Sequence, residues 1–82
     1  MDNVETKMRE IIAKIAETDA VFGPDADFRD ELGVDSYRGV ELIFEIERVF
    51  TVRIPPERYE ELKTLREAIA LVTSLKSSVK VT

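Results

Sequence analysis

Apolar residues recur at spacings of three and four along three segments of this 82-residue chain, as they do on one face of an α-helix. The helices are expected at about 2–17, 36–50 and 64–76, with a shorter one at 57–62 after a Pro-Pro pair. No segment alternates cleanly enough to predict a sheet. The pattern therefore predicts an all-α fold, a small four-helix bundle with three longer helices, one short helix and a long first loop.

Two helices carry sequence signals for their first turns. Asp2 with Glu5, and Thr64 with Glu67, have the spacing of a capping box, in which the two side chains satisfy free N–H groups at a helix start. The first helix is expected to fade near Glu17 to Asp19.

The first loop, at about 18–35, is punctuated by a Gly-Pro pair but is not purely polar. We expect it to pack onto the core and to form a short helical turn at 28–32. Its apolar residues are Val21, Phe22, Phe28, Leu32 and Val34.

Composition narrows the class of protein. The formal charge is -5, which disfavours a nucleic-acid binder and favours basic protein partners. Without cysteine or histidine, the chain lacks a thiol nucleophile and the commonest general base and metal ligand, so we expect neither an enzyme nor a metal site. We expect one domain at 1–76 and a flexible tail at 77–82. No apolar stretch is long enough for a membrane span, and the expected location is cytoplasmic.

The stretch LGVDSY at 32–37, directly before the second helix, is the most informative motif. Gly33 permits a tight turn, and Ser36 is expected at a helix N-terminus, where unpaired N–H groups and the helix dipole favour a phosphate. Asp35 and Ser36 are also ordinary N-cap residues, so capping alone would explain the pair. Capping by Asp35 is compatible with modification of Ser36.

With LGVDSY, the residues that follow carry a resemblance to a known family. Val-Glu-Leu at 40–42, Phe50 and Ile-Pro at 54–55 stand where acyl carrier proteins commonly have them, and TLREAIALV resembles that family's last helix. The likeness extends from about Val4 to Leu75.

The resemblance implies a carrier and not an enzyme. A phosphopantetheinyl transferase would attach 4'-phosphopantetheine from coenzyme A to Ser36, beside Asp35. Acyl intermediates would then be held as thioesters and presented to partner enzymes of fatty-acid, polyketide or related lipid biosynthesis. The cofactor would supply the sulfur that the chain lacks.

The resemblance also implies that acyl synthases, ligases or transferases dock through basic patches on the second helix. The expected contacts are Tyr37, Val40, Glu41, Phe44 and Glu47. A plain solvated helix face is the alternative for each glutamate, and scattered surface residues for Val40 and Phe44. We expect a monomer that neither inserts into a membrane nor binds nucleic acid.

Members of the family can shelter an acyl chain between their helices. By position, the lining is expected from apolar core residues, namely Phe28, Leu42, Ile46, Ile54, Leu62 and Ile69. Ordinary core packing is the other role open to all six.

Four residues depart from the family pattern. Tyr37 replaces the usual leucine, Arg38 and Arg48 interrupt an acidic run, and Gly39 is a poor helix residue that would permit close packing. These departures favour a specialised carrier with its own synthase or ligase. Two other readings remain open: an unmodified helical protein-interaction domain, and an aminoacyl or peptidyl carrier.

Overall fold

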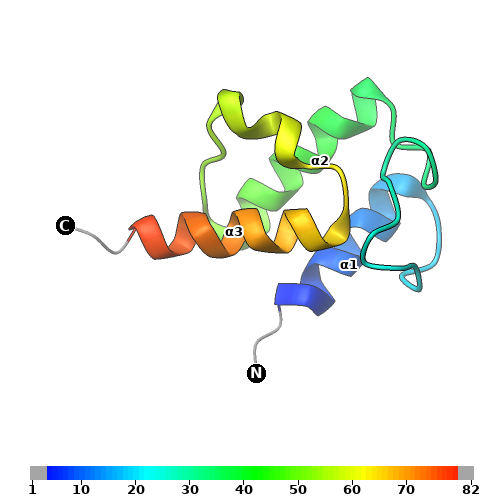
Figure 1. Cartoon of the computed structure of the whole chain (residues 1–82), viewed down its shortest axis with the longest axis horizontal. Coiled ribbons are helices and arrows are strands. Elements are labelled where there is room, and N and C mark those ends of the chain that lie inside the picture. The colour runs from blue at the N-terminus through cyan, green and yellow to red at the C-terminus, as the bar shows by residue number, and fades with distance from the viewer. Residues whose placement is uncertain (1–3, 80–82) are drawn as a thin grey trace.

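The computed structural model describes the backbone of residues 4–79 and the side chains of residues 4–76. Figure 1 shows the arrangement of its helices. Its elements, in chain order, are α1 (Val4–Ala16), α2 (Ser36–Phe50), the 3-10 helix η1 (Pro56–Glu61) and α3 (Leu65–Val79). No strand occurs within these residues, and the expected all-α architecture is confirmed.

Helix α1 packs against both α2 and α3, and η1 packs against α3. The long loop at 17–35 curls around one end of the molecule before it enters α2 (Figure 1). Within the described part of the chain, no helix has both the length and the apolarity to cross a bilayer.

The space between the helices is filled by a single apolar cluster. Each large apolar side chain that is fully buried contributes about 1.5–3 kcal/mol, so this cluster is the main favourable term in folding. Its members are Met8, Ile11, Ile12, Phe28, Val34, Leu42, Ile43, Ile46, Phe50, Val52, Ile54, Leu65, Ala68, Leu71 and Val72.

Two arginines fasten the first half of the loop to the helices. The Arg9 guanidinium donates to the carbonyls of Ala20 (2.9 Å) and Phe22 (2.7 Å) and lies 5.0 Å from the centre of the Phe22 ring. On the other side, Arg66 of α3 makes a double hydrogen bond with Asp25, at 2.8 and 3.0 Å. The loop is thus held from two helices at once.

Phe28 anchors the second half of the loop. Its ring is 3% exposed, its N–H donates to the Lys63 carbonyl (2.8 Å) and its carbonyl accepts from the Val34 N–H (2.9 Å). The prediction that the loop packs onto the core is confirmed here. It is wrong for Val21, which is 90% exposed because the chain turns outward at that point.

The predicted turn at 28–32 is present as a hydrogen-bonded turn, in which the Glu31 N–H donates to the Asp27 carbonyl. The Asp27 carboxylate also accepts from the N–H groups of Arg29 and Asp30. These bonds give the backbone of the turn internal partners even though its residues 29–31 are exposed.

Beyond α2, the chain reverses with Thr51 in the left-handed conformation (φ 55°), its N–H bonded to the Glu47 carbonyl. The Glu47 carboxylate accepts from the backbone N–H of Ile54 at 2.8 Å. Since Ile54 is 1% exposed, this bond satisfies an N–H that water cannot reach. Glu47 therefore closes the connection between α2 and η1.

The ends of the remaining helices refine the sequence predictions. The Thr64 hydroxyl accepts from the Glu67 N–H (3.2 Å), which confirms the Thr64 cap, whereas Asp2 lies outside the described residues. The short helix begins one residue earlier than expected and is a 3-10 helix. Helix α3 continues through residues 77–79, which the sequence pattern placed in the tail.

The Asp25–Arg66 pair predicts a pH dependence. The hydrogen bond from Arg66 holds the pKa of Asp25 below its ordinary value of 3.8. A carboxylate with a depressed folded-state pKa adds stability above its unfolded pKa and loses it as the pH falls through the folded pKa. The melting temperature of Arg66→Gln should therefore lie below wild type by a constant amount above about pH 5 and approach it below pH 3.8. The exposed Arg53→Gln variant is the control, and a difference that persists in acid would contradict the assignment.

Glu47 predicts a second effect on stability. Because Glu47→Ala leaves the buried Ile54 N–H without its acceptor, it should lower the free energy of unfolding by about 1–3 kcal/mol in urea titrations. Glu47→Gln, which keeps an acceptor oxygen, should lose less. Glu41→Ala, an exposed glutamate on the same helix, should change little, and equal losses in the two alanine variants would refute the proposed role.

Candidate functional site

Asp35 is the N-cap of α2. Its backbone is extended (φ -83°, ψ -171°), its side chain accepts from the Arg38 N–H at 2.9 Å and its carbonyl accepts from the Gly39 N–H at 2.8 Å. The cap is therefore Asp35, and Ser36 is the first residue of the helix. Capping therefore does not involve the Ser36 side chain, and modification of Ser36 remains a prediction.

The Ser36 side chain is exposed, and its hydroxyl has no hydrogen-bond partner among the described residues. It stands at the positive end of a 15-residue helix, where the first backbone N–H groups have no intrahelical acceptor. Both features suit a hydroxyl that is to carry a phosphodiester, since the group would be reachable and its charge stabilised.

The approach to Ser36 depends on a left-handed glycine. Gly33 has φ +74°, a conformation in which a Cβ is strained, and it lets the chain turn between Leu32 and the buried Val34. Val34 then enters the core while the two residues that follow it face solvent. The turn thereby lifts Ser36 out of the apolar cluster.

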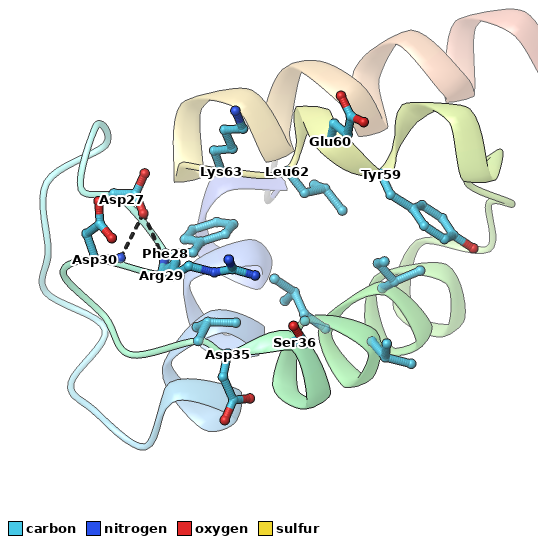
Figure 2. A pocket seen from close by; sticks show the side chains of 15 residues that line it. Asp27, Phe28, Arg29, Asp30, Asp35, Ser36, Tyr59, Glu60, Leu62 and Lys63 are labelled. Carbon is cyan, nitrogen blue, oxygen red and sulfur yellow. Dashed lines mark hydrogen bonds between the residues drawn. The ribbon is translucent and has the colours of Figure 1, made fainter.

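A cleft of about 570 Å³ opens beside Ser36, between α2, the end of the loop and η1. Figure 2 shows Tyr59 and Leu62 reaching into it from the η1 side, opposite Ser36 at the start of α2. The volume lies within the usual range of small-molecule sites. Its apolar lining consists of Phe28, Val34, Val40, Leu42, Ile43, Tyr59 and Leu62.

The structure brings only part of the predicted acyl-chain lining to this cleft. Phe28, Leu42 and Leu62 line it. Ile46 and Ile54 are at most 1% exposed within the core, and Ile69 packs against that core. These three do not line the cleft, because they lie on the side of the core that faces away from it or deeper within it.

The sequence prediction omitted Val34, Ile43 and Tyr59 from the lining. Ile43 lies two helical turns beyond Ser36 on the same side of α2, so helical spacing could have identified it. Tyr59 comes from the six-residue 3-10 helix η1, which has no buried residues and therefore no apolar stripe from which its position could be read.

Three apolar side chains are exposed along the outer face of α2, namely Tyr37 (72%), Val40 (49%) and Phe44 (62%). Tyr37 and Phe44, two of the expected partner contacts, are therefore at the surface. Glu41 is also exposed, with no ion pair among the described residues. Contact of these four with a partner remains a prediction.

The residues expected to change partner choice are engaged within the chain. Arg38 donates to the Ile15 carbonyl at the end of α1 (2.7 Å) and pairs with Glu17 at 3.3 Å. It therefore joins α1 to the first turn of α2. Glu47 was expected to contact partners, but its carboxylate accepts a hydrogen bond from the backbone N–H of Ile54. Arg48 pairs with Glu45, and this hydrogen bond lowers the pKa of the Glu45 carboxyl.

The chain is similar to known proteins in sequence and in structure. Residues 6–72 match the model of a protein family described as "Phosphopantetheine attachment site". Among solved structures, the chain is similar to one described as "a putative acyl carrier protein(Rv0033) from Mycobacterium tuberculosis". The two chains are 27% identical, the match covers 87% of this chain and 96% of the other, and the TM-score is 0.81.

Replacement by alanine should change the stability of the fold in opposite directions at Gly33 and at Gly39. Gly33→Ala places a Cβ at positive φ and should destabilise the fold by about 1–2 kcal/mol. A Cβ on Gly39 would meet nothing within 4 Å, so this glycine does not serve close packing, and Gly39→Ala should stabilise α2 by about 0.5–1 kcal/mol. Urea unfolding of both variants tests this pair. A loss of stability in Gly39→Ala would contradict the open space at that position.

Proposed function

The chain belongs to the phosphopantetheine attachment-site family, which includes the acyl carrier proteins, and from this premise we propose that Ser36 carries the 4'-phosphopantetheine arm. Members of the family are carriers and not catalysts, and their cofactor is covalently bound.

The observation that carries the assignment is that capping of α2 and exposure of a free hydroxyl fall to two different residues. Asp35 caps the helix, so the Ser36 hydroxyl is exposed and makes no hydrogen bond within the described residues. Ser74, the other serine whose surroundings are described, is half-buried in the middle of α3 and has no free helix N-terminus beside it. Of the two serines whose surroundings the structure describes, Ser36 is therefore the one that an attaching enzyme could reach and whose phosphate the helix N-terminus would stabilise.

When bound, the arm supplies a terminal thiol, absent from a chain without cysteine, that holds an acyl group as a thioester. The residues of the chain then have three tasks. Asp35 and Gly33 hold Ser36 at the surface, the positive end of α2 would stabilise the charge of the phosphodiester, and the cleft beside Ser36 would offer apolar walls to the cargo.

We propose acyl groups as the cargo. Phe28, Leu42, Ile43 and Leu62 give the cleft an apolar wall, where an alkyl chain gains about 0.8 kcal/mol for each CH₂ that it buries. The enzymes served would be a phosphopantetheinyl transferase and the synthases, ligases or transferases of fatty-acid, polyketide or related biosynthesis. The unusual exposed residue next to Ser36, Tyr37, favours a dedicated set of acyl-handling enzymes.

The proposal predicts a change in intact mass. Incubation with coenzyme A and a broad-specificity phosphopantetheinyl transferase should add one phosphopantetheine to the wild type and none to Ser36→Ala. Ser74→Ala, the matched control, should be loaded like the wild type. Loading of Ser36→Ala, or of no variant with any of several transferases, would overturn the assignment.

A further inference from the structure

A cationic side chain points into the cleft beside Ser36. Figure 2 shows the Arg29 guanidinium extending from the loop, past the Phe28 ring, toward the start of α2. Other charged residues that line the cleft are directed away from its centre in the same view, namely Asp30, Asp35, Glu60 and Lys63. The opening next to Ser36 therefore combines apolar walls with a positive charge.

The Arg29 guanidinium forms no hydrogen bond or ion pair within the described part of the chain. Its backbone is nevertheless fixed, because its N–H donates to the Asp27 carboxylate at 2.9 Å and the preceding Phe28 is buried. A guanidinium offers five N–H donors and no acceptor, so the free group suits an anion. Other arginines are already bonded within the chain, namely Arg9, Arg38, Arg48, Arg58 and Arg66.

The charges around Ser36 call for such a cation once the arm is attached. A phosphodiester on Ser36 places a negative charge next to Asp35, whose carboxylate already occupies the N-terminus of α2. The end of a helix is equivalent to about half a positive charge, which is too little to offset two anions. A guanidinium directed at the same space supplies the remainder.

We infer that Arg29 binds the phosphodiester of the arm and thereby directs the arm from Ser36 into the cleft. This inference rests on the proposed function, because it requires the arm to stand on Ser36. The planar guanidinium can donate two parallel hydrogen bonds to the oxygens of one phosphate, which fixes the direction of the group as well as its distance.

The other route for the arm leads into a groove between α2 and the end of α1, on the far side of α2 from the cleft. The cations that line this groove are Lys14 and Arg38. Arg38 is bonded to the carbonyl of Ile15 and to Glu17, and Lys14 lies beside the carboxylate of Glu45. Neither cation is as free as Arg29 to bind the phosphodiester.

The test uses the thiol of the loaded arm, which is the only thiol of the protein because the chain has no cysteine. A maleimide nitroxide is attached to it, and intact mass verifies loading and labelling. The nitroxide broadens the resonances of nearby backbone amides, and the effect falls steeply with distance. Tyr59 and Leu62 report on the cleft, and Lys14 and Glu17 report on the groove at the end of α1.

We expect stronger broadening at Tyr59 and Leu62 than at Lys14 and Glu17 in the wild type at about 50 mM NaCl. In Arg29→Gln the ratio of cleft to groove broadening should fall about 1.5- to fivefold, as for the loss of one exposed ion pair. At about 500 mM NaCl the wild-type ratio should approach that of the variant, because salt screens the pair.

Lys63→Gln is the matched control, since it removes a cation that lines the same cleft but is directed away from its centre, and it should keep the wild-type ratio. Amide spectra of the unlabelled proteins verify that each variant is folded.

Equal ratios in the wild type and Arg29→Gln would overturn the inference, as would an equal loss in Lys63→Gln or stronger broadening at Lys14 and Glu17 in the wild type. All three results leave the attachment of the arm intact. An absence of loading in every variant, including the wild type, would instead overturn the proposed function.

Discussion

The position of Ser36 depends on a single buried residue, Phe28. Its ring lies in the core, and its two backbone groups bond to Lys63 before α3 and to Val34 before α2. These bonds join the end of the loop to the segment that connects η1 with α3, and so place the start of α2 beside that connection. The cleft next to Ser36 exists because these two segments are held at its edge.

Helix α2 contributes to two surfaces: one side of it packs into the core, and the other side is exposed to solvent. Leu42, Ile43 and Ile46 face the core, and the same helix exposes Tyr37 and Phe44 on its outer side. The acidic character of the chain does not translate into an open acidic face, because Glu45 is paired within the helix and Glu47 supports the next loop. Net charge is a property of the whole chain, whereas a partner meets the charges that remain unpaired on one face.

The features that could be predicted from the sequence are those decided by neighbouring residues. The bounds of α2 follow from Asp35 at its start and a continuous apolar stripe to Phe50, and the exposure of Phe44 follows from the same periodicity. The bond from Ile54 to Glu47 and the entry of Tyr59 into the cleft depend on how distant segments meet, which no local pattern encodes. For the same reason, the sequence could not show that Phe28, Leu42 and Leu62 line the cleft whereas Ile46, Ile54 and Ile69 do not, and Val21 could not be recognised as exposed.

The central claim is that the covalent arm stands on the first residue of α2. Proteolysis of the loaded protein, followed by fragmentation of its peptides in a mass spectrometer, locates the added group to a single side chain. The account predicts the phosphopantetheine on Ser36 alone, with none on Ser74, Ser77 or Ser78 near the other end of the chain. Its presence on any of those three serines, or on a residue other than Ser36, would contradict the account.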